Sequence, residues 1–189
     1  MEKKNEIVLI VGKKGYGKTT LARAIAQRQS RVMVFDPMAD FGAGIVGSGT
    51  DIAQWMRAKS RRQYTAICRP TSDDDAEMFW ATVGDRSVRD CTVIIDEIDR
   101  VCTPSWTHPV VHDLIHYGRH RSISIVGTCR RPSNTSRDLS ANADSIVAFR
   151  VDEPRDVDYL RRWMDVAGIE TLEPLEYIQR ERCRLMEGL

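Results

Sequence analysis

Short apolar runs recur along the chain, and most of their positions do not alternate with polar ones. The runs lie at residues 6–11, 31–36, 64–68, 91–95, 122–129 and 143–150. Such runs are typical of strands in a parallel sheet that is covered on both faces, whereas a half-exposed strand alternates apolar and polar positions. We therefore predict a mostly parallel central sheet built from these segments.

The segments between the runs carry the signals of helices. Helices are predicted over residues 20–26, 51–59, 72–77 and beyond, 109–117 and 153–166. Thr50 is the expected N-cap of the second helix, Gly118 the C′ residue of the fourth, and Gly168 ends the last. Asp73 to Asp75 fill a first helical turn, where negative charge suits the helix dipole, so we interpret them as capping residues and not as a metal site.

The remaining stretches complete the pattern of a doubly wound α/β fold. Residues 41–49 are rich in glycine and predict a flexible loop, and the stretch from Tyr177 onward favours an edge strand over a helix. The alternation of strands and helices predicts an α/β fold. At 189 residues the chain is expected to form one domain, 1–189, with a core of about residues 6–165 and a C-terminal extension, 166–189.

Composition narrows the classes of function. The net charge is +1, so any contact with nucleic acid must come from a local basic patch. No run approaches 18 apolar residues, and the N-terminus does not resemble a signal peptide. The five cysteines are scattered without C-x-x-C spacing, which indicates reduced thiols and no metal cage. We expect a cytoplasmic protein, or for a viral one a location in the host cytoplasm or the virion.

The clearest chemical signal follows the first apolar run. Residues 12–19 fit G-x-x-x-x-G-K-[ST], the P-loop, with a strand before the motif and a helix after it. Its backbone N–H groups turn toward phosphate oxygens at the positive end of the helix. In this pattern Lys18 reaches the β- and γ-phosphates and Thr19 ligates Mg²⁺, so ATP and Mg²⁺ are the predicted cofactors. The predicted nucleotide-binding residues are Gly12, Lys13, Lys14, Gly15, Tyr16, Gly17, Lys18, Thr19 and Thr20. The alternative is an ordinary glycine-rich turn between strand and helix.

A pair of carboxylates ends the run at 91–95. Asp96 would hold Mg²⁺ through water, because Mg²⁺ keeps several of its waters, and Glu97 would polarise a water molecule for attack on the γ-phosphate. Two acids at a strand end can be plain surface residues, but their position after a P-loop favours a catalytic pair. A glutamate at this point favours hydrolysis over transfer to a second substrate.

All four histidines lie at intervals of four residues, at 108, 112, 116 and 120. The last three are expected to share one face of a helix. Zinc binding is one interpretation. We prefer a subunit-contact face, because the sequence shows no cysteine or acid that completes a ligand set.

Two further stretches point to one family. Residues 118–132 read GRHRSISIVGTCRRP, and residues 140–144 read SANAD ahead of a strand that ends Phe149-Arg150. With the P-loop and the Asp96–Glu97 pair, they resemble the FtsK/HerA superfamily of DNA-translocating ATPases. Those proteins carry an arginine before this strand, Gln-Arg-Pro after it and a similar Asn-Ala-Asp segment before the next. The resemblance covers roughly residues 6–165.

The resemblance implies a P-loop NTPase fold of the RecA-like (ASCE) type, a three-layer sandwich in which the strand at 122–129 inserts between the P-loop strand and the Asp-Glu strand. It also implies a homo-oligomeric ring of five or six subunits that hydrolyses ATP and moves double-stranded DNA. The one-domain size is similar to that of viral genome-packaging ATPases, which implies a capsid or portal-vertex protein as a further partner.

One position departs from the family pattern. Where the family has glutamine this chain has Arg130, and Arg131 matches the family arginine. Arginine donates to phosphate but cannot accept a hydrogen bond from the attacking water. Either Arg130 stabilises transition-state charge, or the sensor is rewired and hydrolysis without a partner is slow. The resemblance also implies an arginine that completes a neighbour's site; Arg119 is the first candidate, followed by Arg130 and Arg137.

Alternatives to a packaging motor stay open at this point. A filamentous-phage assembly or conjugation ATPase would share these features. A P-loop kinase would need an acceptor pocket and an arginine-rich lid, and Glu97 argues against it. A nucleotide-gated structural protein with little turnover is kept open by Arg130.

Overall fold

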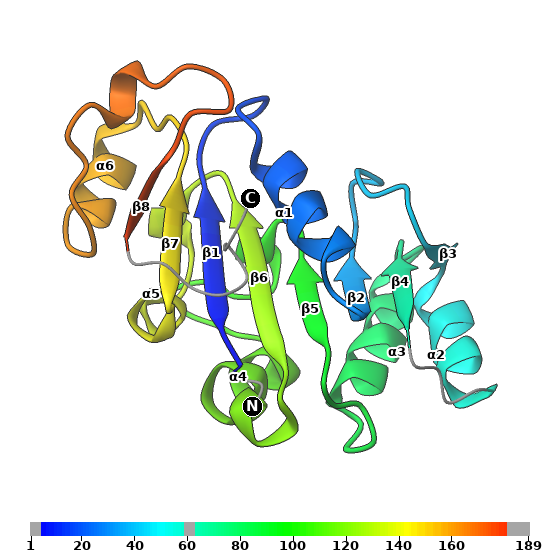
Figure 1. Ribbon diagram of the computed structural model, residues 1–189. Helices are drawn as coiled ribbons and strands as arrows, with labels where there is room; N and C mark the ends of the chain where they lie inside the picture. The colour runs from blue at the N-terminus through cyan, green and yellow to red at the C-terminus, as the bar shows by residue number, and fades with distance from the viewer. Residues whose placement is uncertain (1–4, 59–62, 181–189) are drawn as a thin grey trace.

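The computed structural model describes residues 5–58 and 63–180 of the chain. Within these residues eight strands form one sheet in the order β3-β4-β2-β5-β6-β1-β7-β8 (Figure 1). Neighbouring strands are parallel except β7 and β8, which are antiparallel. The strands are β1 (Ile7–Val11), β2 (Arg31–Phe35), β3 (Ile45–Gly47), β4 (Tyr64–Cys68), β5 (Thr92–Ile95), β6 (Ser124–Cys129), β7 (Ser145–Ala148) and β8 (Ile178–Arg180). As predicted, β6 lies between the P-loop strand β1 and the Asp-Glu strand β5.

The interior strand β1 shows why the apolar runs form this sheet. All five of its residues are buried. Ile7, Leu9 and Val11 belong to the core on one face, and Val8 and Ile10 belong to the core on the other. Burying such an aliphatic side chain fully stabilises the fold by roughly 1.5–3 kcal/mol. Because both faces are covered, consecutive positions must be apolar, as the sequence pattern indicated.

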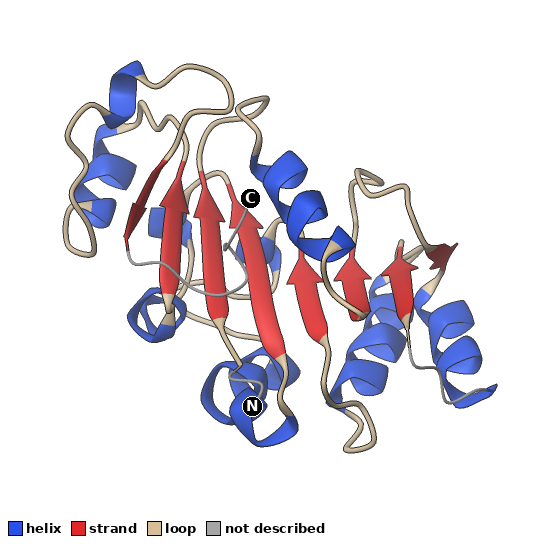
Figure 2. Ribbon diagram, viewed as in Figure 1, coloured by secondary structure: helices blue, strands red, loops and turns tan. Residues whose placement is uncertain are grey.

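Helices on both faces give three layers (Figure 2). On one face α1 (Lys18–Gln27) places Leu21 and Ile25 in the core that contains Val8 and Ile10. The opposite core receives side chains from α2 (Gly49–Ala58), α3 (Asp73–Gly84), α4 (Pro109–Tyr117), α5 (Arg137–Asn142) and α6 (Pro154–Leu160). Short 3₁₀ turns are η1 (Ile98–Arg100), η2 (Gly118–Arg121), η3 (Pro132–Asn134) and η4 (Ile169–Thr171). The predicted α/β sandwich is confirmed, and no described helix is long and apolar enough to cross a membrane.

The region before α2 differs from the prediction. Residues 41–49 are not all loop, because β3 pairs in parallel with β4 at the sheet edge. The N-cap of α2 is Ser48 and not Thr50: the Asp51 N–H donates to Ser48 Oγ at 3.1 Å, and the helix already includes Gly49. The Thr50 hydroxyl instead donates to Asp75 at 3.1 Å. A tertiary contact therefore determines which of two good capping residues is used.

The predicted end of the last helix is also wrong. α6 ends at Leu160, and the expected continuation to residue 166 is a series of turns in which the Trp163 and Met164 N–H groups both donate to the Leu160 carbonyl. The apolar residues of this segment recur at the spacing of a helix, which is why the sequence predicts one. α4 ends at Tyr117 as predicted, but Gly118 is not a left-handed C′ residue, since its φ is −53° and it begins η2. The predicted C-terminal strand is confirmed as β8; the rest of that stretch, residues 181–189, lies outside the described residues.

The histidines do not form one face. His108 is buried at the N-cap of α4, where its Nδ1 accepts from the Val110 N–H and its Nε2 lies 3.2 Å from Glu77. His112 and His116 lie on α4, but His120 falls in η2, after the helix has ended. The prediction that the last three share a helical face is therefore wrong, because the 3₁₀ turn changes the period.

Asp75 joins the starts of two helices. Its buried carboxylate accepts hydrogen bonds from the backbone N–H groups of Gly49, Thr50 and Thr71 at 3.0, 2.9 and 3.0 Å. The N-cap of α3 itself is Ser72, whose hydroxyl accepts from the Asp75 N–H. The capping interpretation thus holds for Asp75, but the helix start that it stabilises is that of α2.

This arrangement predicts a pH-dependent stability. Burial alone would raise the pKa of Asp75, but the hydrogen bonds outweigh it and hold the pKa at about 2, below the usual 3.8. A carboxyl whose folded-state pKa is depressed stabilises the fold above the unfolded-state pKa and loses that contribution as pH falls. We expect Asp75→Asn to lower the melting temperature at pH 7 by about 5 °C or more. The difference from wild type should shrink between about pH 4 and pH 2.

The matched control is Asp74→Asn, an exposed change in the same helical turn, which should leave the melting temperature near that of wild type. Equal melting temperatures for Asp75→Asn and wild type at pH 7 would contradict the role given to this carboxylate.

Candidate nucleotide site

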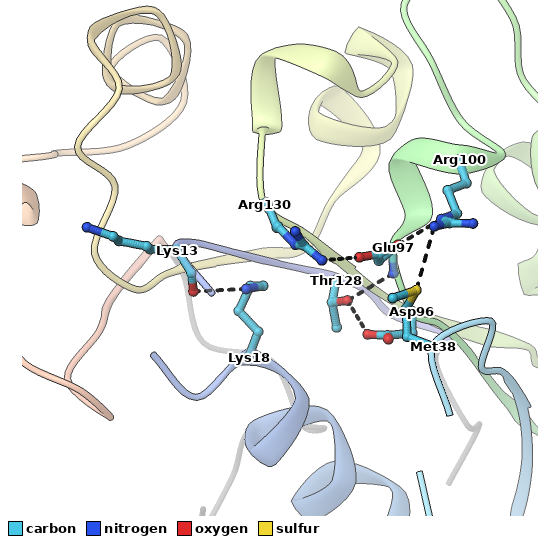
Figure 3. A network of polar contacts seen from close by, with 8 residues as sticks. All are labelled: Lys13, Lys18, Met38, Asp96, Glu97, Arg100, Thr128 and Arg130. Carbon is cyan, nitrogen blue, oxygen red and sulfur yellow. Dashed lines mark hydrogen bonds and ion pairs between the residues drawn. The ribbon is translucent and has the colours of Figure 1, made fainter. Parts of the chain in front are cut away.

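The P-loop connects β1 to α1 through glycines in left-handed conformations. φ is 140° at Gly12, 85° at Gly15 and 114° at Gly17, values that other residues rarely adopt. Gly17 is the N-cap of α1, so Lys18 is its first residue. The Lys18 ammonium turns back over the loop and donates to the Lys13 carbonyl at 3.0 Å (Figure 3). The loop and the ammonium therefore face the same space.

Packing restricts substitution at Gly12 more than at Gly15. A Cβ at Gly12 would lie 2.7 Å from Phe149 Cβ, whereas one at Gly15 would meet nothing within 4 Å. Left-handed strain alone costs roughly 1–3 kcal/mol, and overpacking adds a similar amount. We expect Gly12→Ala to lower the melting temperature by several degrees more than Gly15→Ala, as thermal unfolding would measure. An equal decrease in melting temperature for the two variants would mean that the contact with Phe149 does not destabilise Gly12→Ala.

A threonine connects Asp96 and Glu97 at the end of β5. The Thr128 hydroxyl, from β6, donates to Asp96 Oδ1 at 2.6 Å and accepts from the Glu97 backbone N–H at 3.2 Å. Asp96 is only 3% exposed. Thr128 thus fixes the position of Asp96 through one carboxylate oxygen, and it makes the ends of β5 and β6 one polar unit.

Glu97 is held by two arginines. Its Oε1 lies 2.6 Å from the Arg130 guanidinium and its Oε2 lies 2.7 Å from Arg100 Nε (Figure 3). Its backbone is left-handed, with φ 52°, and is followed by η1. Both oxygens of the predicted base are therefore engaged in ion pairs in this state of the molecule.

The P-loop, Asp96, Glu97, Thr128 and Arg130 line one cavity of about 320 Å³ at the carboxyl ends of β1, β5 and β6. The P-loop and α1 contribute Lys14, Gly15, Gly17, Lys18, Thr19 and Thr20, and the facing wall contains Asp96, Glu97 and Arg130. The other predicted P-loop residues, Gly12, Lys13 and Tyr16, do not line it. The Lys13 ammonium instead pairs with Asp152 at 2.6 Å, and the Tyr16 ring lies beneath the Arg150 guanidinium, 5.9 Å from it.

Burial disfavours the charged forms of both Lys18 and Asp96 in this cavity. It lowers the pKa of the Lys18 ammonium, and Arg130 lowers it further, while Asp96 and Glu97 act in the opposite direction. Burial also raises the pKa of the Asp96 carboxyl, against the hydrogen bond from Thr128. A polyphosphate beside Lys18 and a cation beside Asp96 would both relieve these costs. The Thr19 hydroxyl and the Asp96 carboxylate offer the oxygen ligands that Mg²⁺ prefers, so the donor set fits this ion.

Comparison with known families assigns the fold. A family model described as an AAA domain matches residues 1–130. The chain belongs to the AAA domain family. No curated protein matches the sequence.

Solved structures extend the comparison from the matched AAA domain to nearly the whole chain. The genome packaging NTPase B204 of Sulfolobus turreted icosahedral virus 2, in complex with ATP-γ-S, is 21% identical with a TM-score of 0.73, over 95% of this chain and 92% of that one. VirB4 of Thermoanaerobacter pseudethanolicus is 9% identical with a TM-score of 0.57, over 99% and 92%. The pCW3 conjugation coupling protein TcpA is 14% identical with a TM-score of 0.55, over 82% and 52%. The predicted P-loop NTPase fold is thereby confirmed, and it resembles the fold of a viral genome packaging NTPase.

The crowded arginines of this AAA domain separate into different roles. Arg121 donates to the Val83 and Asp85 carbonyls at 3.0 Å, which closes the end of α3. Arg131 pairs with the buried Asp156 at 2.7 Å. Arg130 lines the cavity, whereas Arg119 and Arg137 are exposed and lie outside the cavity lining.

Arg119 cannot reach the cavity of its own subunit. It lies in η2, which precedes β6, whereas the cavity is at the other end of that strand. Six residues of strand separate the two ends by roughly 20 Å. A role in catalysis for Arg119 would therefore have to be in another subunit.

Five lining residues of this site were missed from the sequence: Arg23, Asp40, Thr128, Cys129 and Leu175. Thr128 lies in the stretch that was expected to face the γ-phosphate, and a hydroxyl at the end of an otherwise apolar strand was a usable signal. Leu175 lines the cavity, and its N–H donates to the Tyr16 carbonyl at 3.0 Å, which attaches the C-terminal segment to the P-loop. No local motif marks Leu175, so its contact could be found only from the fold.

Proposed function

We propose that this chain is a Mg²⁺-dependent ATPase and the motor subunit of a ring that moves double-stranded DNA, with packaging of a viral genome as its setting. The observation that carries the proposal is the arrangement of Lys18, Thr19, Asp96 and Glu97 around one cavity. This set provides phosphate binding, two oxygen ligands for a cation and a carboxylate base.

Each residue has one task in the proposed reaction. The P-loop N–H groups and Lys18 bind the phosphates, and Thr19 and Asp96 hold Mg²⁺, which when bound neutralises charge on the β- and γ-phosphate oxygens. Glu97 accepts a proton from the attacking water, for which one of its oxygens must leave its arginine. Arg130 lines the cavity and pairs with Glu97, so a γ-phosphate would draw it away from Oε1 and add a positive charge to the transition state.

Likeness to B204 supports the DNA and packaging part of the proposal, since the two chains match over nearly their full lengths. We place five or six subunits in the ring, in the cytoplasm of the host or in the virion, with a capsid or portal-vertex protein as partner. The likeness to TcpA favours a second candidate, an ATPase of conjugation, which would share the chemistry and differ in its partner.

Release of inorganic phosphate from ATP, measured with and without duplex DNA and with and without Mg²⁺, tests the proposal. We expect release that requires Mg²⁺ and rises several-fold with DNA, and mass photometry with an ATP analogue and DNA should show five or six subunits. Release unaffected by DNA would contradict translocation. ADP formation without free phosphate would indicate a kinase, and no turnover in any condition would indicate a nucleotide-gated structural protein.

A further inference from the structure

A second cluster of ligand-type side chains lies between α4 and α5, away from the nucleotide cavity. It consists of His112 and His116 from α4 and Asp138 from the first turn of α5. The two helices are in contact and lie next to each other in Figure 1. The premise drawn from the sequence, that no acid completes a ligand set, is therefore wrong: packing of α5 supplies one.

The spacing of the three groups suits a single ion. Each residue offers one ligand atom, and these atoms all lie within 4.8 Å of one another. His116 Nε2 and Asp138 Oδ2 are 3.5 Å apart. Two ligands at about 2.0–2.2 Å from a tetrahedral zinc ion are separated by roughly 3.3–3.5 Å, so this pair already has nearly the required separation. The two imidazole rings, one helical turn apart, have centroids separated by 4.4 Å.

His116 Nε2 is buried and has no hydrogen-bond partner within the described part of the chain, although Asp138 Oδ2 lies 3.5 Å away. A buried polar atom without a hydrogen bond destabilises the fold. A metal ion bound there would remove that effect. His112 Nδ1 lies 3.7 Å from Asp113, and a carboxylate beside the second ring nitrogen is the usual neighbour of a metal-bound histidine.

We propose that His112, His116 and Asp138 bind a divalent transition-metal ion of the Zn²⁺ type. Two imidazoles and one carboxylate favour such an ion over Mg²⁺ or Ca²⁺, which prefer ligand sets made of oxygen atoms. His112 is 52% exposed and Asp138 62% exposed in their side chains, so a fourth position is open to water or to an incoming group.

Such an ion would join two elements that adjoin the arginines. α4 leads directly into η2, which contains Arg119, and α5 starts at Arg137, after η3. A bond from the metal to each helix would therefore fix these segments relative to each other. The site is independent of the nucleotide cavity, so its existence does not depend on the proposed ATPase activity.

The site is tested by titrating Zn²⁺ into the untagged, chelator-treated full chain without nucleotide. Calorimetry measures the binding, and thermal unfolding measures the change in stability. We expect one Zn²⁺ per chain and a higher melting temperature with the ion. His112→Ala and Asp138→Asn, both at exposed positions, should each weaken binding by at least about tenfold and remove the thermal shift. Co²⁺ in place of Zn²⁺ should give a visible absorption band in wild type that both variants lose.

His120→Ala is the matched control, since it removes a nearby exposed histidine that is not in the cluster. It should bind Zn²⁺ as wild type does. The site does not exist if wild type shows no saturable binding up to about 100 µM Zn²⁺, a concentration far above the dissociation constants of structural zinc sites. Binding that survives in His112→Ala and Asp138→Asn, or falls equally in His120→Ala, would likewise overturn the proposal.

Discussion

Glu97→Gln is expected to bind ATP and Mg²⁺ as wild type does and to hydrolyse ATP at least roughly 10²-fold more slowly, the usual range for loss of a general base. Glutamine has the same shape, and its carbonyl oxygen can still accept a hydrogen bond from Arg130 or Arg100, so the wall of the cavity should be preserved. Only the capacity to accept a proton from water is lost. Single-turnover hydrolysis, together with equilibrium binding of a fluorescent ATP analogue, separates the two effects.

The matched control for this change is Glu153→Gln. Glu153 also faces an arginine, Arg131, at 3.7 Å, but it is half exposed and does not line the nucleotide cavity. It should keep wild-type turnover. If Glu97→Gln hydrolyses ATP at the wild-type rate, Glu97 is not the base, and the ion pairs with Arg100 and Arg130 are then structural.

Arg119→Ala is expected to abolish turnover while leaving nucleotide binding intact. The arginine is exposed at the end of β6 opposite the cavity of its own subunit, so the cavity that it would complete belongs to a neighbour. Loss of a trans-acting arginine at a phosphoryl-transfer site slows turnover by roughly 10³- to 10⁵-fold. Phosphate release by the variant alone, in rings confirmed by mass photometry, measures this loss.

A mixing experiment then assigns the arginine to the neighbouring subunit. Arg119→Ala subunits retain Glu97, and Glu97→Gln subunits retain Arg119, so a mixed ring contains some complete sites. Activity that returns on mixing and peaks near equal proportions would support a trans role. If both variants assemble, are inactive alone and stay inactive when mixed, the assignment to Arg119 fails, and Arg130 and then Arg137 become the next candidates.

The sheet and the phosphate-binding loop could be predicted because their signals are local. β1 needs apolar residues at consecutive positions, and a tight turn into a helix needs glycines, so both features are visible in the sequence. Asp96 and Glu97 were found for the same reason, as polar residues that directly follow a buried run. The place of β6 between β5 and β1 came from the family resemblance and not from the pattern of the run itself.

The missed features depend on contacts between distant segments. Ser48 and Thr50 are both good capping residues, and only the carboxylate of Asp75, on another helix, determines their roles. Glu97 is held by Arg130, 33 residues away, and no spacing rule predicts such a pair. Asp138 joins the histidines of α4 only because α5 packs beside that helix. Side-chain partners of this kind become visible only when the packing of the elements is known.

The interior position of β1 also determines when the phosphate-binding turn can form during synthesis. The Glu6 N–H donates to the Ser124 hydroxyl, 118 residues away, and the Ile7 N–H donates to Asp144, 137 residues away. Contacts this distant in sequence close large loops and slow folding. A ribosome releases β1 first, and this strand has neither neighbour until β6 has been made and only one until β7 has been made. ATP binding during refolding should therefore report the last stage of folding and not the first.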